Sequence, residues 1–197
     1  MPITTEKKPK IKLPSLSVVK KALYADWTLR VKRRDGWKCL LCDSDDNLTA
    51  HHWYVSDHHA HAARYCVDNG ATLCYACHIR GIHTRADYES VMRVLDVVVD
   101  KGAKPTNIGP LQKTELTTEL LRRLWDEMRA RPVLLDDYEA LVDVRGKKLF
   151  LSVDAYRPIA VVGNTVIAPG FGLCEVAVVS PDGESGRFRY TLRRLQT

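Results

Sequence analysis

Apolar side chains recur at every fourth position through residues 17–34, SVVKKALYADWTLRVKRR. The repeating positions are Val19, Leu23, Trp27 and Val31. Because an α-helix has about 3.6 residues per turn, this spacing lines one face and predicts an amphipathic α-helix. Ser17 is in position to cap its start, and Asp35-Gly36 to end it.

Two further stretches have the same helical period. In residues 87–102 the apolar face consists of Tyr88, Val91, Met92, Leu95, Val98 and Val99, and Gly102 ends the helix. In residues 114–132 the inward positions are Leu120, Leu121, Leu124 and Met128, and Pro132 follows the end. The segment between them, AKPTNIGPLQK, predicts a linker.

From about residue 140 the pattern changes to short runs rich in β-branched and aromatic residues. Turn dipeptides such as Gly163-Asn164 and Asp182-Gly183 separate these runs, so we expect a small β-rich module of roughly four strands. On a strand, the run RFRYTLRR would put Arg187 and Arg189 on one face and Phe188 and Tyr190 on the other. That alternation suits a basic DNA-facing surface, and it equally suits an edge strand with solvated arginines.

These elements predict an α+β fold. We expect a basic arm over residues 1–16, a domain with flanking helices over 17–102, a linker and helix over 103–130, and the β-rich module over 131–197. Within the first domain, the pattern predicts a short hairpin around 48–55, a loop through 56–68 and a helix beginning near Leu73.

The cysteines gather in the first domain. Of six, four form two C-x2-C pairs, Cys39/Cys42 and Cys74/Cys77. Two such pairs supply the four thiolates that tetrahedral Zn²⁺ prefers. The sequence therefore predicts a structural zinc site, which closes a lobe with little apolar mass of its own.

Histidines surround the second cysteine pair. His51 and His52 are adjacent, so on a strand they point to opposite faces and can do separate work on either side of a phosphate. A second metal held by one of this pair with His78 and His83 would keep coordination positions open, as catalytic sites do.

The segments RDGWKCLLCDSDDNLTAHHWY and RYCVDNGATLCYACHIRGIH carry, in order, C-x2-C, His-His, Asn-Gly, LCxxCH and a trailing His. This combination resembles an HNH endonuclease of the ββα-metal class in its zinc-stapled form, over about residues 27–90. The resemblance implies a ββα-metal nuclease lobe and a hydrolase that cleaves DNA to a 5′-phosphate and a 3′-hydroxyl.

The resemblance also implies a role for each matched residue. His51, His78 and His83 would ligate a catalytic divalent cation, Mg²⁺ or Mn²⁺ in cells, although imidazole-rich sites also accept Ni²⁺, Co²⁺ or Zn²⁺. His52 would be the general base that takes a proton from the attacking water, and Asn69 would brace the loop that orients it. The structural Zn²⁺ would be held by Cys39, Cys42, Cys74 and Cys77.

One spacing departs from the family. Four residues separate His78 from His83, where the family commonly has three. On an ideal α-helix these side chains would diverge by about 140°. Gly81 could distort the helix and bring His83 back, or a loop histidine, His58, His59 or His61, could complete the shell. The decisive test is whether the ligands of His51 and His78 lie within about 5 Å, since metal–nitrogen bonds are near 2 Å.

The net charge of +6 is uneven, with eleven Lys and Arg in residues 1–38 against three acidic residues. A basic arm favours a polyanion such as DNA through counterion release, although a solubilising tail is the simpler reading. The candidate phosphate-binding residues are Lys32, Arg33, Arg34, Arg64 and Arg80.

No run of about 18 apolar residues predicts a membrane span, and the N-terminus lacks a secretory h-region. Paired cysteines without such a signal favour a reducing, intracellular and cytoplasmic setting. Size and the solitary nuclease lobe are typical of a phage or mobile-element enzyme, by analogy only. The sequence does not indicate an oligomeric state.

Two other functions remain open. The chain could be a zinc-stabilised nucleic-acid-binding protein without catalysis, or a protein–protein adaptor built on a zinc lobe. A pure binder needs none of the matched catalytic and ligand residues, which disfavours the first; these are His51, His52, Asn69 and His78. The basic bias and the histidine placed as a general base disfavour the second.

Overall fold

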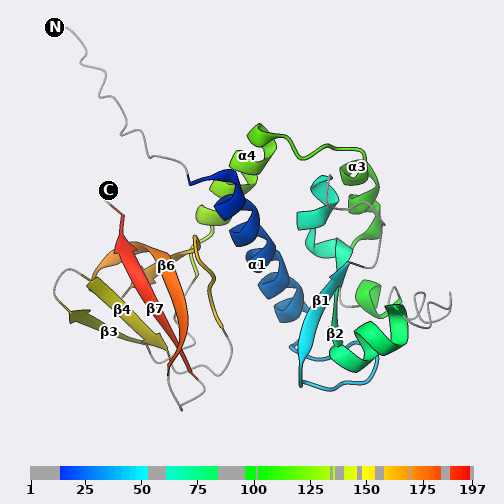
Figure 1. The fold of residues 1–197 in the computed structure, drawn as a ribbon, viewed down its shortest axis with the longest axis horizontal. Coiled ribbons are helices and arrows are strands. Elements are labelled where there is room, and N and C mark those ends of the chain that lie inside the picture. The colour runs from blue at the N-terminus through cyan, green and yellow to red at the C-terminus, as the bar shows by residue number, and fades with distance from the viewer. Residues whose placement is uncertain are drawn as a thin grey trace, which may run out of the picture.

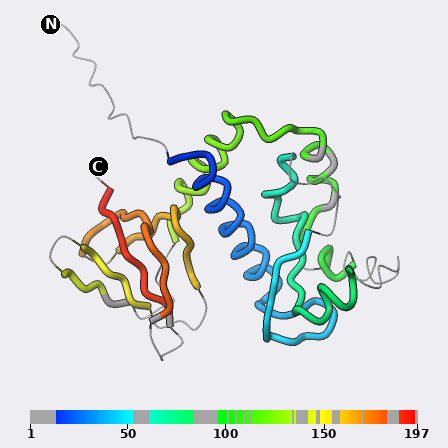
Figure 2. The backbone as a smooth tube through the Cα atoms, viewed as in Figure 1, coloured from blue at the N-terminus to red at the C-terminus, as the bar shows by residue number. Residues whose placement is uncertain are grey.

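The computed structural model describes residues 14–52, 61–83, 96–100, 102–133, 135, 140–145, 148–153, 158–168, 170–182 and 187–195. It is a mixed α/β fold, compatible with the α+β class. Helix α1 (Leu16–Arg34) runs through the middle of the molecule, with a five-stranded sheet on one side and a two-stranded sheet on the other (Figures 1 and 2).

Helix α1 confirms the period of four, because all four repeating apolar residues are buried. Its start is one residue earlier than predicted. Ser15, in extended conformation, is the N-cap in place of Ser17, and the two hydroxyls lie 3.1 Å apart. Asp35 follows the helix as its C-cap, as expected.

The metal lobe, which we define as residues 35–52 and 61–83, has an antiparallel pair of strands. Strand β1 (Leu48–His52) pairs with β2 (Gly70–Cys74), with His52 opposite Gly70. The predicted hairpin within 48–55 was therefore wrong, since β1 has a distant partner. The helix expected near Leu73 was wrong too, because Leu73 lies in β2 and the helical segment is η4 (Ala76–His83).

Residues 56–60 of the expected loop lie outside the described residues. In its remaining part, two short 3₁₀ segments, η2 (Ala62–Tyr65) and η3 (Val67–Asn69), precede β2. The glycine after Asn69 has a packing reason. A Cβ atom on Gly70 would lie 3.0 Å from the Trp27 ring and would overlap Val31 more closely still. Only glycine lets β2 pack this closely against α1.

The segment after the metal lobe differs in part from expectation. Residues 84–95, which hold Tyr88, Val91, Met92 and Leu95, lie outside the described residues, whereas residues 96–100 are helical. Val98 is buried as predicted, but Val99 is 44% exposed, so its inward placement was wrong. The predicted linker is instead helical in two short pieces, η5 (Pro105–Asn107) and α3 (Ile108–Gln112).

Helix α4 (Thr118–Arg129) is capped by Thr117, whose hydroxyl accepts from the Leu120 amide at 3.1 Å. Its buried residues are Leu121, Trp125 and Met128, so Trp125 joins the predicted inward set and Leu120 is only partly buried. This face packs against the N-terminal half of α1.

The β-module, our name for the described residues from 133 onward, has five strands where roughly four were expected. They are β3 (Ala140–Arg145), β4 (Lys148–Val153), β5 (Thr165–Ala168), β6 (Gly172–Asp182) and β7 (Arg187–Arg194). The antiparallel order is β3-β4-β7-β6-β5, so β7 lies inside the sheet and the edge-strand interpretation was wrong. Phe188 and Tyr190 do face the core.

Buried contacts join the β-module to the helices. Gly163, at φ +92°, approaches α4 so closely that an added Cβ would lie 2.5 Å from the Trp125 ring. The Asn164 amide donates to the Asp26 carboxylate of α1 at 3.1 Å. Among the described residues, no helix is long and apolar enough to cross a bilayer.

Candidate metal-binding sites

The four paired cysteines meet at one end of the metal lobe. Their Sγ atoms all lie within 4.8 Å of one another, and the Sγ atoms of Cys42 and Cys74 are 3.7 Å apart. Zn–S bonds of about 2.3 Å in a tetrahedron give sulfur–sulfur edges of about 3.8 Å. The thiols therefore fit a tetrahedral ion such as zinc, which this cluster can hold.

The chemistry of the thiols agrees with that fit. Burial raises the pKa of the Cys77 thiol, and hydrogen bonding with the three neighbouring thiols raises it further. The Cys77 amide lies 3.5 Å from the Cys74 sulfur, to which it donates. The raised pKa disfavours the thiolate form of Cys77, which a bound divalent cation would stabilise.

Three histidines form a second cluster. His51 extends from β1, and His78 and His83 extend from η4; their ligand nitrogens lie within 4.8 Å of one another. The Nε2 atoms of His78 and His83 are 3.0 Å apart. Cis ligands of an octahedral ion with metal–nitrogen bonds of about 2.1 Å would be about 3.0 Å apart, so the spacing fits a metal ion. The 5 Å criterion set from the sequence is met.

The helix type explains how the extra residue is accommodated. Segment η4 is a π-helix, in which backbone hydrogen bonds run from residue i to i+5, so residues five apart lie on one face. That is the separation of His78 and His83, whose ring centroids are 4.7 Å apart. Burial lowers the pKa of His78, and so does the neighbouring His83. A lowered pKa keeps the imidazole neutral, as a metal ligand must be.

The other histidines differ in position. His61 is not part of the cluster, and its Nδ1 is buried with no hydrogen-bond partner. His58 and His59 lie outside the described residues. Within the described residues, His83 itself completes the cluster, and no loop histidine takes its place as a ligand.

His52 is held apart from this cluster. Its ring stacks on the Trp27 indole, with centroids 3.9 Å apart and planes 3° apart, and its Nε2 lies 2.8 Å from the Arg64 carbonyl oxygen. Adjacent strand residues point to opposite faces, which is why His51 can join the metal cluster while His52 packs on α1.

Asn69 is completely buried and braces the segment that contacts His52. Its side-chain amide donates to the Ala63 carbonyl at 3.1 Å. The next carbonyl along the chain, that of Arg64, is the one against His52. Asn69 thus acts on His52 through the backbone of η2.

The three basic residues at the end of α1 have partners inside the fold. Arg34 pairs with the buried Asp35 at 2.8 Å and donates to two carbonyls, those of Val67 at 2.9 Å and Gly70 at 2.5 Å. Lys32 donates to the Leu48 carbonyl at 2.7 Å, and burial lowers its pKa. Arg33 donates to the Ile159 carbonyl in the β-module. These contacts indicate folding roles.

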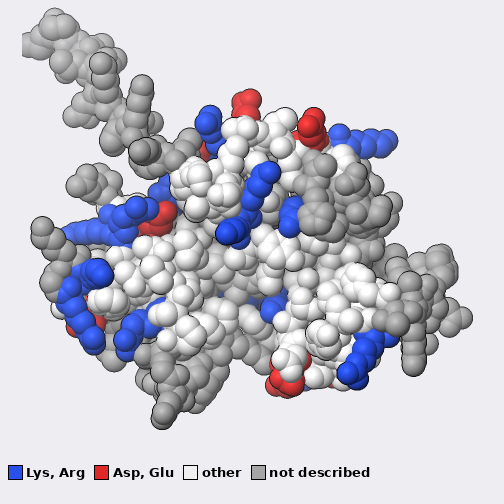
Figure 3. All heavy atoms as spheres, in the orientation of Figure 1, with Lys and Arg blue, Asp and Glu red and all other residues white. Residues whose placement is uncertain are grey.

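The remaining basic candidates lie in the metal lobe itself. Arg80 is exposed on η4, between His78 and His83. The Arg64 guanidinium lies 4.9 Å from the Tyr24 ring centroid, on the same aromatic cluster that supports His52. Elsewhere, Lys and Arg are spread over the β-module and the helices (Figure 3).

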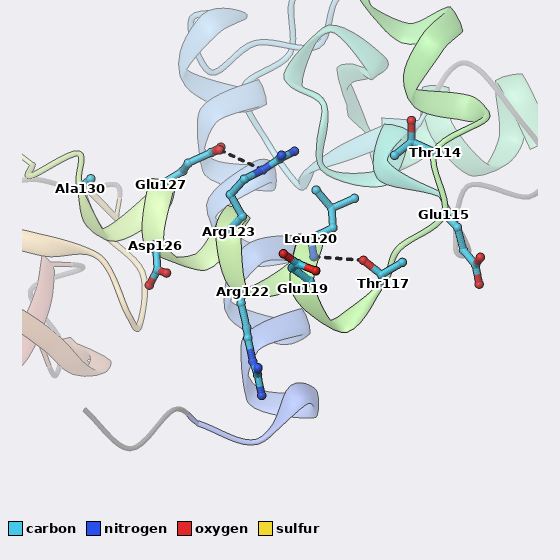
Figure 4. A pocket seen from close by; sticks show the side chains of 10 residues that line it. All are labelled: Thr114, Glu115, Thr117, Glu119, Leu120, Arg122, Arg123, Asp126, Glu127 and Ala130. Atoms are coloured by element: carbon cyan, nitrogen blue, oxygen red, sulfur yellow. Dashed lines mark hydrogen bonds and ion pairs between the residues drawn. The ribbon is translucent and has the colours of Figure 1, made fainter. Parts of the chain in front are cut away.

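A separate hollow of about 920 Å³ lies along α4, and Figure 4 shows the side chains that line it. Its lining contains no histidine or cysteine and includes both acidic and basic side chains; Arg123 and Glu127 pair at 3.5 Å. The histidine cluster is instead partly exposed. An open site suits a polymeric substrate, which an enclosed cavity would exclude.

Trp27 and Asp35 are the site residues that sequence reasoning missed. Trp27 was predicted only as core, and nothing in a period of four indicates which ring it stacks on. No family model, no curated protein and no solved structure matches this chain. The arrangement of the side chains is therefore the basis for assigning a function to this protein.

Proposed function

We propose that this protein is a metal-dependent endonuclease of the HNH type that hydrolyses DNA phosphodiester bonds. One observation carries the proposal. Three imidazoles within 4.8 Å of one another include His51, and the next residue, His52, presents a fourth imidazole fixed by a stack and a hydrogen bond. A metal cluster beside a separately oriented imidazole can supply both the charge stabilisation and the general base that phosphodiester hydrolysis uses.

The two clusters have different tasks in this proposal. The four thiols would hold a structural zinc that fixes β1, β2 and the start of η4. The three imidazoles would hold the catalytic cation, Mg²⁺ or Mn²⁺ in cells. When bound, that cation would supply positive charge to offset the negative charge that develops on the phosphate oxygens.

His52 is the proposed general base. Because a carbonyl oxygen can only accept, the nitrogen facing Arg64 carries the hydrogen, and in a neutral ring Nδ1 then carries the lone pair. Nδ1 takes one proton from the attacking water as the oxygen–phosphorus bond forms. The bond from phosphorus to the 3′-oxygen breaks, and that oxygen takes a proton from solvent. His52 later returns its proton to solvent.

Arg64 and Arg80 are the proposed phosphate contacts. Arg80 lies on η4 with His78 and His83, and the backbone carbonyl of Arg64 on η2 contacts His52. The chemistry of guanidinium and phosphate favours such contacts, which position the polymer without reading its sequence.

The test is nicking of supercoiled plasmid by purified protein with Mg²⁺ or Mn²⁺. We expect His52→Ala to reduce the rate by about 10²–10⁴-fold, the usual contribution of a general base. His61→Gln is the matched control, a histidine of the same lobe outside the cluster, and should cut like wild type.

Zinc content and plasmid binding are measured on the same samples. Cleavage lost only in His52→Ala, with binding and zinc unchanged, supports the enzyme. Binding of DNA without cleavage by the wild type, with either metal, would overturn it in favour of the zinc-stabilised nucleic-acid-binding protein.

A further inference from the structure

The aromatic residues that contact the His52 ring belong to α1, a helix that carries none of the candidate metal ligands. The Trp27 indole is 1% exposed and nearly parallel to the imidazole, so the ring of His52 has one face covered. Tyr24, one turn earlier, lies 5.3 Å from the Trp27 ring, and the Arg64 guanidinium lies over Tyr24. A stack this close restricts how the imidazole can tilt.

Trp27 is itself fixed by the segment that holds His52. Its Nε1–H donates to the Cys66 carbonyl at 2.9 Å. Nearby carbonyls of the same short segment accept from three other side chains. Ala63 accepts from Asn69, Arg64 from His52, and Val67 from Arg34. One stretch of backbone thus orients the imidazole and the indole beneath it together.

These contacts constrain His52 in two ways. The carbonyl of Arg64 selects the tautomer with hydrogen on Nε2, and the indole sets the plane of the ring. A hydrogen bond alone would still allow the ring to rotate about the Nε2–oxygen line. With the plane set as well, Nδ1 has one direction.

We propose that Trp27 is a positioning residue for His52, which it holds in the orientation that directs Nδ1 at the attacking water. This rests on the proposed function for its catalytic meaning. Its structural content, one tautomer in one ring orientation, does not depend on activity.

Two substitutions separate the plane of the ring from its bulk. Trp27→Phe keeps a flat aromatic surface and loses the bond to Cys66, whereas Trp27→Leu removes the surface. We expect Trp27→Leu to lower kcat by about 100-fold, the cost of misplacing a reacting group by about 1 Å. KM for DNA should stay unchanged, and Trp27→Phe should recover much of the loss.

Leu23→Ala is the matched control for lost packing. Leu23 is buried on the same helix, in the cluster that α1 makes with α4. It should lower the melting temperature as Trp27→Leu does and leave kcat unchanged. Equal loss of kcat in Leu23→Ala and Trp27→Leu would reduce Trp27 to an ordinary core residue and overturn the proposal.

Nitrogen-15 NMR of the imidazoles gives a readout that needs no cleavage. We expect His52 of the zinc-loaded wild type to show the Nε2–H tautomer alone. Without the indole in Trp27→Leu, the ring can tilt away from the Arg64 carbonyl, so the hydrogen bond that selects this tautomer weakens and a mixture of tautomers should appear. A single unchanged tautomer and unchanged kcat in Trp27→Leu would contradict the inference. If the wild type shows the single tautomer and Trp27→Leu the mixture, but the wild type cuts no DNA, the proposed function fails while the positioning by Trp27 stands.

Discussion

The β-module and the metal lobe differ in what their cores are made of. Twelve buried residues form one cluster in the β-module, and eleven of them are not cysteine. Among the described residues, the core around the thiols has seven buried members, of which five lie in the metal lobe; two of these five are the candidate ligands Cys39 and Cys74. Because apolar burial contributes about 25 cal/mol per Å², the smaller core of the metal lobe is worth much less. The comparison teaches that cross-linking by an ion can replace apolar mass.

The largest effect that we predict comes from removing one of the four cysteines that are the candidate zinc ligands. We expect Cys39→Ala to unfold the metal lobe, because a structural zinc contributes about 10–16 kcal/mol of apparent binding free energy to folding. Hydrogen exchange should show lost protection in β1 and β2 and retained protection in β4 and β7. Cys39 is suited to this test because it is fully buried and belongs only to the thiol cluster.

Cys174→Ala is the control for this experiment. Cys174 is a buried thiol of the β-module, outside the metal cluster. The variant should keep its zinc and the protection of β1 and β2. Unchanged protection of those strands in Cys39→Ala would mean that the metal lobe folds on apolar contacts after all.

The β-module should instead be sensitive to its apolar core. Leu151 is completely buried in β4, and Leu151→Ala should cost about 2–5 kcal/mol, since it removes buried methyl groups and leaves a cavity. Urea denaturation measures the free energy of unfolding. Ile167→Ala, at a residue of β5 that is 49% exposed, should cost less than about 0.5 kcal/mol. Zinc content should be unchanged in both, and loss of zinc in Leu151→Ala would show that the two cores are not separate.

The features that short sequence motifs encode could be predicted from the sequence. The C-x2-C pairs, the His-His pair and the trailing histidine indicated both ligand sets, and the period of four indicated α1. The partner of β1 was not predictable in this way. Its pairing with β2 joins residues far apart in the chain, and a hairpin signal is local.

Other features depended on backbone geometry or burial that no short window contains. In an α-helix, His78 and His83 would point to different faces. The π-helical hydrogen bonds of η4 bring them to one face. Arg34 looked like a phosphate contact because it lies in a basic run. Its partner, the buried Asp35, was read as a helix stop, and an ion pair of adjacent residues has no sequence signature.

The smallest effect that we predict concerns α4, which contacts both regions. Leu121 belongs to the buried cluster that includes Tyr65 of the metal lobe, and Trp125 lies against Gly163 of the β-module. Thr117→Ala removes the hydroxyl that caps its first turn, at a cost of about 1 kcal/mol. For a chain of this size, that lowers the melting temperature by about 2–4 °C. Thr117→Ser keeps the hydroxyl and should melt like wild type. If α4 couples the regions, the protection of backbone amides against hydrogen exchange should weaken equally in β1 and β4 of Thr117→Ala. Weakening confined to one strand would show that each region opens by itself, and that the ion and the apolar core stabilise separate folding units.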